Sequence, residues 1–91
     1  MAGQAISKIS QSVVTVGTST TQIPTTPTVG RGSLLMRNEG SNTVFLGDAD
    51  VTKDDGYPLK AGEQLPMDIS GPAVYGVTST STSEVRVLEG I

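Results

Sequence analysis

The segment 37–63, RNEGSNTVFLGDADVTKDDGYPLKAGE, constrains the fold more than any other part of the chain. Short apolar and β-branched runs alternate there with polar turns, which contain Gly40, Gly47, Gly56 and Gly62. Glycine adopts tight and left-handed turn conformations more readily than any other residue. Short strands separated by such turns are typical of β-hairpins. The segment therefore predicts a series of short β-strands joined by tight turns.

The rest of the chain has the same character. Turn signals recur at a spacing of about 8–12 residues, which is typical of an antiparallel sandwich or barrel. The clearest period of two is in residues 64–69, where Leu65, Met67 and Ile69 share one face. Pro66 marks that strand as an edge or a bulge. The other predicted strands are at 12–17, 33–38, 43–47, 73–79 and 84–89, with an extended edge segment near Gln22 and Ile23.

These patterns predict an all-β fold, a small antiparallel β-sandwich or barrel of six to seven short strands. The 91 residues are enough for one domain, which we place at 12–91. Residues 1–11 are small and polar and are interpreted as an extended N-terminal arm ordered by contact, or equally as a frayed terminus. The Thr/Pro-rich stretch 18–32 either lies across a neighbouring subunit or is, as we slightly favour, an ordinary surface connection.

Composition excludes several classes of function. The net charge is −3 and the six Lys and Arg residues are scattered, which argues against a nucleic-acid partner. No stretch approaches the roughly 18–20 apolar residues of a membrane span. The chain has no His and no Cys, so thiolate metal sites are impossible and a nucleophilic serine would have only lysine as its base. We expect no enzymatic activity and no cofactor.

Asp48, Asp50, Asp54 and Asp55 form an acidic cluster, and the alternate positions Asp48, Asp50, Thr52 and Asp54 resemble the start of a calcium loop. The match then fails, because Lys53 stands at the sharp-turn glycine and Leu59 at the closing glutamate. We interpret the cluster as hydrated turn carboxylates, with Asp48 or Asp54 accepting hydrogen bonds from nearby backbone N–H groups. A carbohydrate- or calcium-binding adhesion module remains the alternative of another class.

A domain this small is marginally stable alone and gains from association with partners. Exposed apolar and aromatic side chains are the candidates for such contacts, and Tyr57 beside Pro58 in a turn is the best placed of them. The candidate interface residues are Ile6, Ile9, Ile23, Val29, Tyr57 and Pro58.

The chain contains an Arg-Asn pair at 37–38, the strand VFLG at 44–47, a V-T pair at 51–52, the turn GYPLKAGE at 56–63 and the strand VRVLE at 85–89. Through these motifs it resembles small virion proteins of tailed bacteriophages over about residues 13–90. In those proteins an Arg-Asn pair ends a strand, a V-x-L/I-G strand and a V-T pair follow, a G-x-x-L-x-x-G-E turn comes next, and a V-R-V-x-E strand closes the chain. The matching positions are Arg37, Asn38, Val44, Leu46, Gly47, Val51, Thr52, Gly56, Leu59, Gly62, Glu63, Val85, Arg86, Val87 and Glu89. The opening VVTVGTSTTQIP also fits, with Val14, Val16, Gly17, Ile23 and Pro24.

This resemblance implies a β-sandwich on the phage particle, most simply a capsid decoration (cement) protein that stabilises the head through subunit contacts. Its partners would then be the major capsid protein and copies of itself in a homotrimer, on a virion assembled in the host cytoplasm. A tail, neck or head-fibre-base component is the alternative within the same class.

Overall fold

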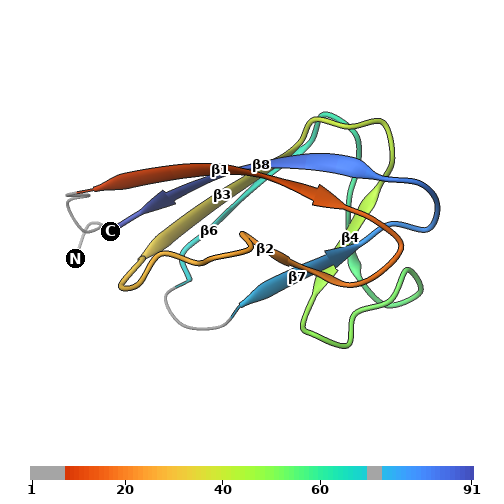
Figure 1. Ribbon diagram of the computed structural model, residues 1–91, viewed down its shortest axis with the longest axis horizontal. Helices are drawn as coiled ribbons and strands as arrows, with labels where there is room; N and C mark the ends of the chain where they lie inside the picture. The colour runs from red at the N-terminus through yellow and green to blue at the C-terminus, as the bar shows by residue number, and fades with distance from the viewer. Residues whose placement is uncertain (1–7, 70–72) are drawn as a thin grey trace.

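The computed structural model describes residues 8–69 and 73–91, which form eight β-strands in two antiparallel sheets (Figure 1). Sheet A has the order β1 (Ile9–Val16), β8 (Ser83–Gly90), β3 (Ser33–Asn38), β6 (Gln64–Met67). Sheet B has the order β2 (Thr21–Ile23), β7 (Val74–Val77), β4 (Val44–Gly47), β5 (Tyr57–Leu59). The prediction of a small antiparallel β-sandwich is confirmed.

The described residues contain more strands than the six to seven expected, and the first strand starts earlier. β5 is only three residues long and contains Pro58, so it is hard to distinguish from the polar turn before it. β1 begins at Ile9, inside the predicted arm, and pairs without interruption with β8. Ser10, Gln11 and Ser12 gave this part of the strand no hydrophobic alternation. The extended edge segment predicted near Gln22 is β2.

The core lies between the two sheets and consists of alternate side chains from their facing surfaces. Val85 and Val87 of β8 are buried while Arg86 is exposed, as expected for a strand with one face in the core. Leu65, Met67 and Ile69 pack against the core, partly buried, as their shared face predicted. The fully or nearly fully buried members include Val14, Val16, Ile23, Leu34, Met36, Val44, Leu46 and Leu59.

The side chain of Asn38 connects three parts of the sandwich and is fully buried at the end of β3. Its amide nitrogen donates to the carbonyl oxygens of Asn42, at 2.7 Å, and Leu59, at 2.9 Å. Its amide oxygen accepts hydrogen bonds from the Gly40 N–H, at 3.1 Å, and the Ser83 hydroxyl, at 2.6 Å. One buried amide therefore fixes the turn after β3 to β5 and β8.

Two of the turn glycines are needed for different reasons. Gly62 has φ +81°, the left-handed conformation for which glycine is favoured. Gly40, for which the sequence also suggested a positive φ, does not have one. A Cβ at Gly40 would instead lie 2.8 Å from the Ser83 Cα and closer still to its hydroxyl oxygen. Gly40 is thus explained by the close approach of the turn to β8.

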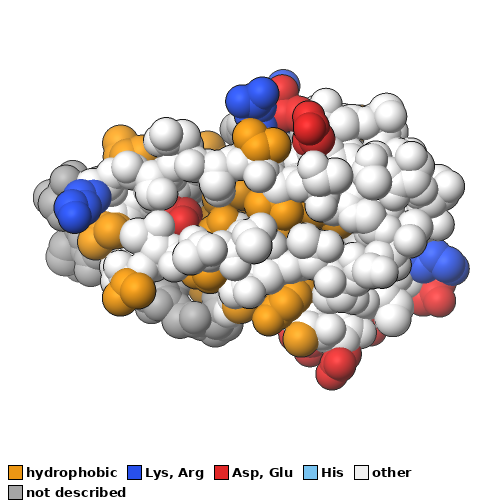
Figure 2. Space-filling model, in the orientation of Figure 1, with side chains coloured by type: hydrophobic (Ala, Val, Ile, Leu, Met, Phe, Trp, Pro, Cys, Tyr) orange, Lys and Arg blue, Asp and Glu red, His pale blue; other side chains and the backbone are white. Residues whose placement is uncertain are grey.

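Figures 1 and 2 look onto the side of the sandwich where β1 and β2 form the edges of their sheets. Most of the charged side chains in this view lie around its rim (Figure 2). In the ranges 8–69 and 73–91 there is no helix that is long and apolar enough to cross a membrane.

Candidate interaction surface

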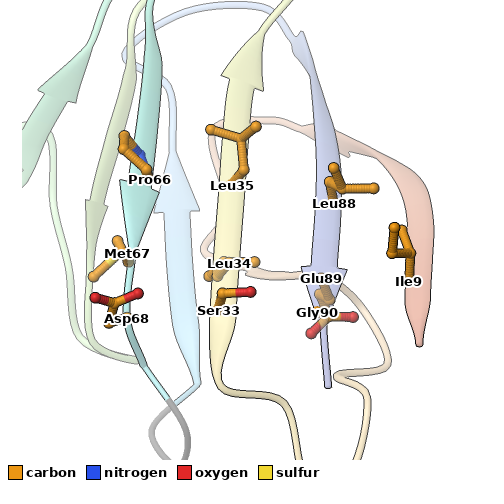
Figure 3. A pocket seen from close by; sticks show the side chains of 10 residues that line it. All are labelled: Ile9, Ser33, Leu34, Leu35, Pro66, Met67, Asp68, Leu88, Glu89 and Gly90. Carbon is orange, nitrogen blue, oxygen red and sulfur yellow. The ribbon is translucent and has the colours of Figure 1, made fainter. Parts of the chain in front are cut away.

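The outer face of sheet A carries a row of apolar side chains. Leu35 of β3 is aligned with Leu88 of β8 on one side and with Pro66 of β6 on the other. Ile9 of β1 lies at the end of the same face, separated from Ser33 by Gly90 (Figure 3). Ile9 is 65% exposed and Leu88 is 42% exposed. These positions face solvent because their neighbours in each strand face the core.

A shallow groove of about 340 Å³ lies along this row, and we call it the sheet A groove. Gly90 has no side chain, so the surface is hollow between Ile9 and Ser33. The outward-facing apolar walls are formed by Ile9, Leu35, Pro66 and Leu88, and Asp68 adds a carboxylate at the border (Figure 3). A groove of this composition fits an apolar side chain or loop of another protein better than a polar small molecule.

Charged residues border the apolar row on the side toward the β3–β4 turn. Arg37 and Arg86 are directly opposite each other in the register of β3 and β8, and both are exposed. Arg37 pairs with the carboxylate of Glu39, and this ion pair is largely exposed to solvent. Val13 of β1 is aligned with Arg86 and is 49% exposed. The face therefore has an apolar part and a polar border, as protein interaction surfaces do.

The structure spreads the predicted interface residues over several surfaces. Ile9 borders the sheet A groove. Val29 is 93% exposed on the connection between β2 and β3. Tyr57, 60% exposed, lines a separate recess of about 180 Å³ with Leu65 and others, and Pro58 is exposed beside it in β5.

Two of the predicted interface residues do not belong to any described surface. Ile23 is 0% exposed and is a core residue, because β2 turns this side chain toward the opposite sheet. Its assignment to an interface is therefore corrected. Ile6 lies outside the described residues.

Sequence reasoning missed Leu35 and Leu88, although the second carried a signal. In β8 the exposed positions hold Glu84 and Arg86 and then Leu88, an apolar residue where the alternation calls for a polar one. An apolar residue at an outward position of an otherwise alternating strand indicates a contact surface.

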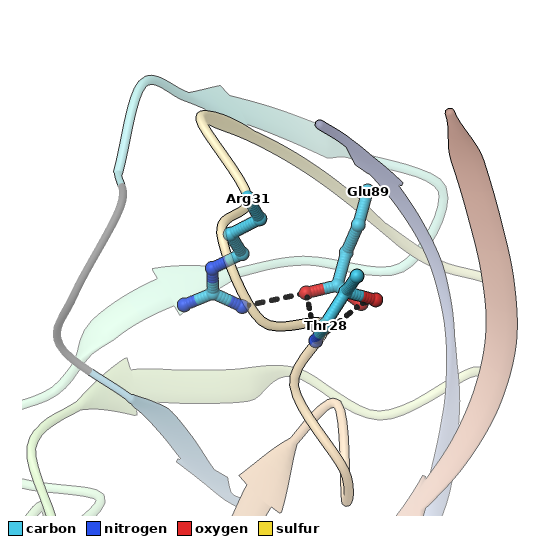
Figure 4. A network of polar contacts seen from close by, with 3 residues as sticks. All are labelled: Thr28, Arg31 and Glu89. Carbon is cyan, nitrogen blue, oxygen red and sulfur yellow. Dashed lines mark hydrogen bonds and ion pairs between the residues drawn. The ribbon is translucent and has the colours of Figure 1, made fainter. Parts of the chain in front are cut away.

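A buried polar cluster joins the connection after β2 to β8 (Figure 4). The Arg31 guanidinium donates to the Glu89 carboxylate at 2.9 Å, and both side chains are 3% exposed. The Thr28 hydroxyl donates to the same carboxylate at 2.7 Å, and its backbone N–H lies 3.3 Å from both oxygens. Burial alone would raise the pKa of Glu89, but the hydrogen bonds from Thr28 and Arg31 and the Arg31 charge outweigh burial and lower it.

The acidic cluster in the β4–β5 connection is engaged in its own turns. The Asp48 carboxylate accepts a hydrogen bond from the Asp50 N–H at 2.9 Å, as predicted for Asp48. The second such carboxylate is Asp55, not Asp54. Asp55 accepts from the Thr52 N–H at 2.8 Å and from its hydroxyl, which lowers the Asp55 pKa. Asp54 pairs with Lys53 at 3.1 Å.

No group of three or more His, Cys, Asp or Glu residues that could hold a metal ion occurs among the described residues. Asp48, Asp55 and Glu63 accept hydrogen bonds from backbone N–H groups of their own turns. The apolar row of sheet A can bury surface against another protein.

Comparison with family models, with curated proteins and with solved structures gave no significant match to this chain.

Proposed function

We propose that this protein is a structural component of a tailed-phage particle, a capsid decoration protein that binds the major capsid protein through the outer face of sheet A. The apolar row with its groove is the observation that carries the proposal. Ile9 and Leu88 keep large parts of their side chains in water, and a partner that covers these parts would add apolar burial that the isolated domain lacks. Full burial of such a side chain contributes about 1.5–3 kcal/mol.

The resemblance to phage virion proteins supports the same proposal. The residues that carry it include Asn38, whose amide joins the turn to β5 and β8, and Gly62, whose positive φ shapes the turn before β6. Glu63 follows, and its carboxylate accepts a hydrogen bond from the Lys60 N–H at 2.8 Å. These motif residues therefore have architectural roles, which is what a family of structural proteins would share.

A shell also suits weak individual contacts. The groove is shallow and its apolar row is short, so one domain would bind one capsid subunit with modest affinity. A capsid repeats the same site at every equivalent position, and linked copies bind far more tightly than single ones. Binding to the capsid would in turn stabilise a small domain by mass action.

The experiment uses phage particles made with and without this gene. Particles that lack the protein should break open at lower temperature or after milder osmotic shock, and the purified protein should restore their resistance. Ile9→Asp and Leu88→Asp place charges in the row and should abolish restoration. Ser79→Asp adds the same charge on the exposed β7–β8 connection and is the matched control.

Equal resistance of the two kinds of particle would overturn the cementing role. If the protein occupies only a single ring at one vertex of the phage particle, it is a neck or tail component instead. Circular dichroism and thermal unfolding of each variant show whether a loss of binding reflects a loss of fold.

A further inference from the structure

The four edges of the two sheets are unequally protected. β2 and β5 are three residues long, and β5 contains Pro58. β6 is four residues long and contains Pro66. Short length and proline are the usual means by which proteins prevent a sheet edge from pairing with another chain. β1 is the exception, since it is eight residues long and pairs evenly with β8 over its whole length.

The sequence of β1 also lacks the other protective features. ISQSVVTV contains no proline and no charged residue, and no bulge interrupts its register with β8. Lysine or another charge on an edge strand normally opposes association. An uninterrupted, uncharged edge of this length is a template for pairing with a further strand.

The backbone hydrogen bonds show which groups of β1 are available. Lys8 and Ile91 exchange two hydrogen bonds, so Lys8 points its backbone groups toward β8. In an antiparallel pair this direction alternates along the strand. The backbone groups of Ile9, Gln11, Val13 and Thr15 therefore point away from β8, and no strand of the described chain pairs with them.

We infer that two copies of this chain pair through β1, antiparallel and related by a two-fold axis at Ser12. In this register Ile9 pairs with Thr15 of the second copy and Gln11 with Val13. Ser12 then lies opposite its own equivalent. Every outward-pointing N–H and C=O of the four residues named above finds a partner, because the set is symmetric about Ser12. Sheet A of one copy and sheet A of the other, each with four strands, then become one continuous sheet.

The side chains suit this pairing. Residues directly opposite in an antiparallel pair share a face, and diagonal neighbours are also within reach. Val13, 49% exposed in the single chain, becomes a diagonal neighbour of both Val13 and Ile9 of the second copy. No like charges are brought together, since residues 9–16 are uncharged.

A two-fold axis perpendicular to the sheet keeps both outer faces on the same side. The two sheet A grooves would then face the same partner. This doubling of the capsid-binding surface rests on the proposed function, whereas the pairing depends only on the β1 edge.

A single cysteine tests the register, because the chain has none of its own. Ser12 is exposed, and in the proposed pair its two Cα atoms form a non-hydrogen-bonded pair about 4.5 Å apart. That separation allows a disulfide. Ser12→Cys should therefore form a covalent dimer on mild oxidation. Thr15→Cys is the control, because the two copies of residue 15 would lie about 20 Å apart along the strands, at about 3.3 Å per residue.

Gln11→Pro tests the edge without disturbing the fold. It removes an N–H that points away from β8, so the single domain should unfold at about the same temperature. Analytical ultracentrifugation should show a dimer for the unaltered chain and a monomer for Gln11→Pro. The pairing would be overturned if Thr15→Cys formed the covalent dimer and Ser12→Cys did not. It would also be overturned if the unaltered chain were a monomer at millimolar concentration, or if it formed the trimer that the phage resemblance implies. A monomer that still protects capsids would overturn the pairing alone, and a dimer that does not would overturn only the proposed function.

Discussion

Arg31 and Glu89 form a buried ion pair that joins two segments 58 residues apart in the chain. Arg31 lies on the connection between β2 and β3, and Glu89 lies near the end of β8 with its side chain turned inward. The pair thus holds the connection that crosses between the sheets against the last strand.

Replacing Glu89 by glutamine should destabilise the fold by about 3–5 kcal/mol, because the buried guanidinium of Arg31 loses its counter-charge. Urea denaturation measures the change in the free energy of unfolding. Glu84→Gln, exposed on the same strand, should change it by less than about 0.5 kcal/mol. Equal effects of the two substitutions would show that the buried pair does not govern stability.

The double variant Arg31→Met/Glu89→Leu removes both charges. Apolar side chains of similar size often replace a buried ion pair without loss of stability, so the double variant should be more stable than Glu89→Gln. The comparison uses the free energies of unfolding of Arg31→Met, Glu89→Leu and the double variant. A double variant as unstable as the sum of its single changes would mean that the two residues act independently.

Stability should fall in acid. The pKa of Glu89 is lower in the folded protein than its ordinary value of 4.5. Between these two pKa values the unfolded chain therefore binds more protons than the folded protein does. The contribution of Glu89 is fully present above about pH 4.5 and is lost as the pH falls through the folded-state pKa. Urea midpoints between pH 3 and pH 7 measure this, and Glu89→Gln should flatten the profile. An equally steep profile in that variant would assign the acid sensitivity to other carboxylates.

Asn38→Ala should cost about 3 kcal/mol, because the buried Ser83 hydroxyl and the carbonyl of Leu59 lose their partner. Thermal unfolding, monitored by circular dichroism, measures this loss of stability. Asn42→Ala is a matched control, since its amide donates one exposed hydrogen bond, to the Thr82 carbonyl. If both variants unfold at the same temperature, the amide of Asn38 does not hold the turn to β5 and β8.

Calcium should not change the unfolding temperature. Asp48 and Asp55 already accept hydrogen bonds within their turns, and Asp54 pairs with Lys53. Thermal unfolding in millimolar calcium and in excess chelator should therefore coincide. A rise of several degrees in calcium would instead support the adhesion module.

The fold class followed from the sequence because hydrophobic alternation and turn residues report local structure. Leu65, Met67 and Ile69 showed their shared face directly, and Pro66 marked an edge strand. The early start of β1 could not be seen, since Ser10, Gln11 and Ser12 carry no apolar pattern and are held by pairing with β8. Pairing partners distant in sequence leave little trace in a local pattern.

The candidate surface was harder to predict for the same reason. Leu35, Pro66 and Leu88 come from three strands, and only the register of sheet A brings them into one row. Ile9, one of the predicted interface residues, is exposed, whereas Ile23 was assigned to a surface from a Thr/Pro-rich context and lies in the core. The pairing of Arg31 with Glu89 likewise depends on the tertiary structure, because it joins a loop to a strand far along the chain.

The most direct test of the structural role is the amount of this protein in purified phage particles, measured by quantitative mass spectrometry against the major capsid protein. A decoration protein that binds the repeated sites of a shell should be present in many copies, in a fixed ratio to the major capsid protein. Particles made from the same genome that contain none of it would contradict the account.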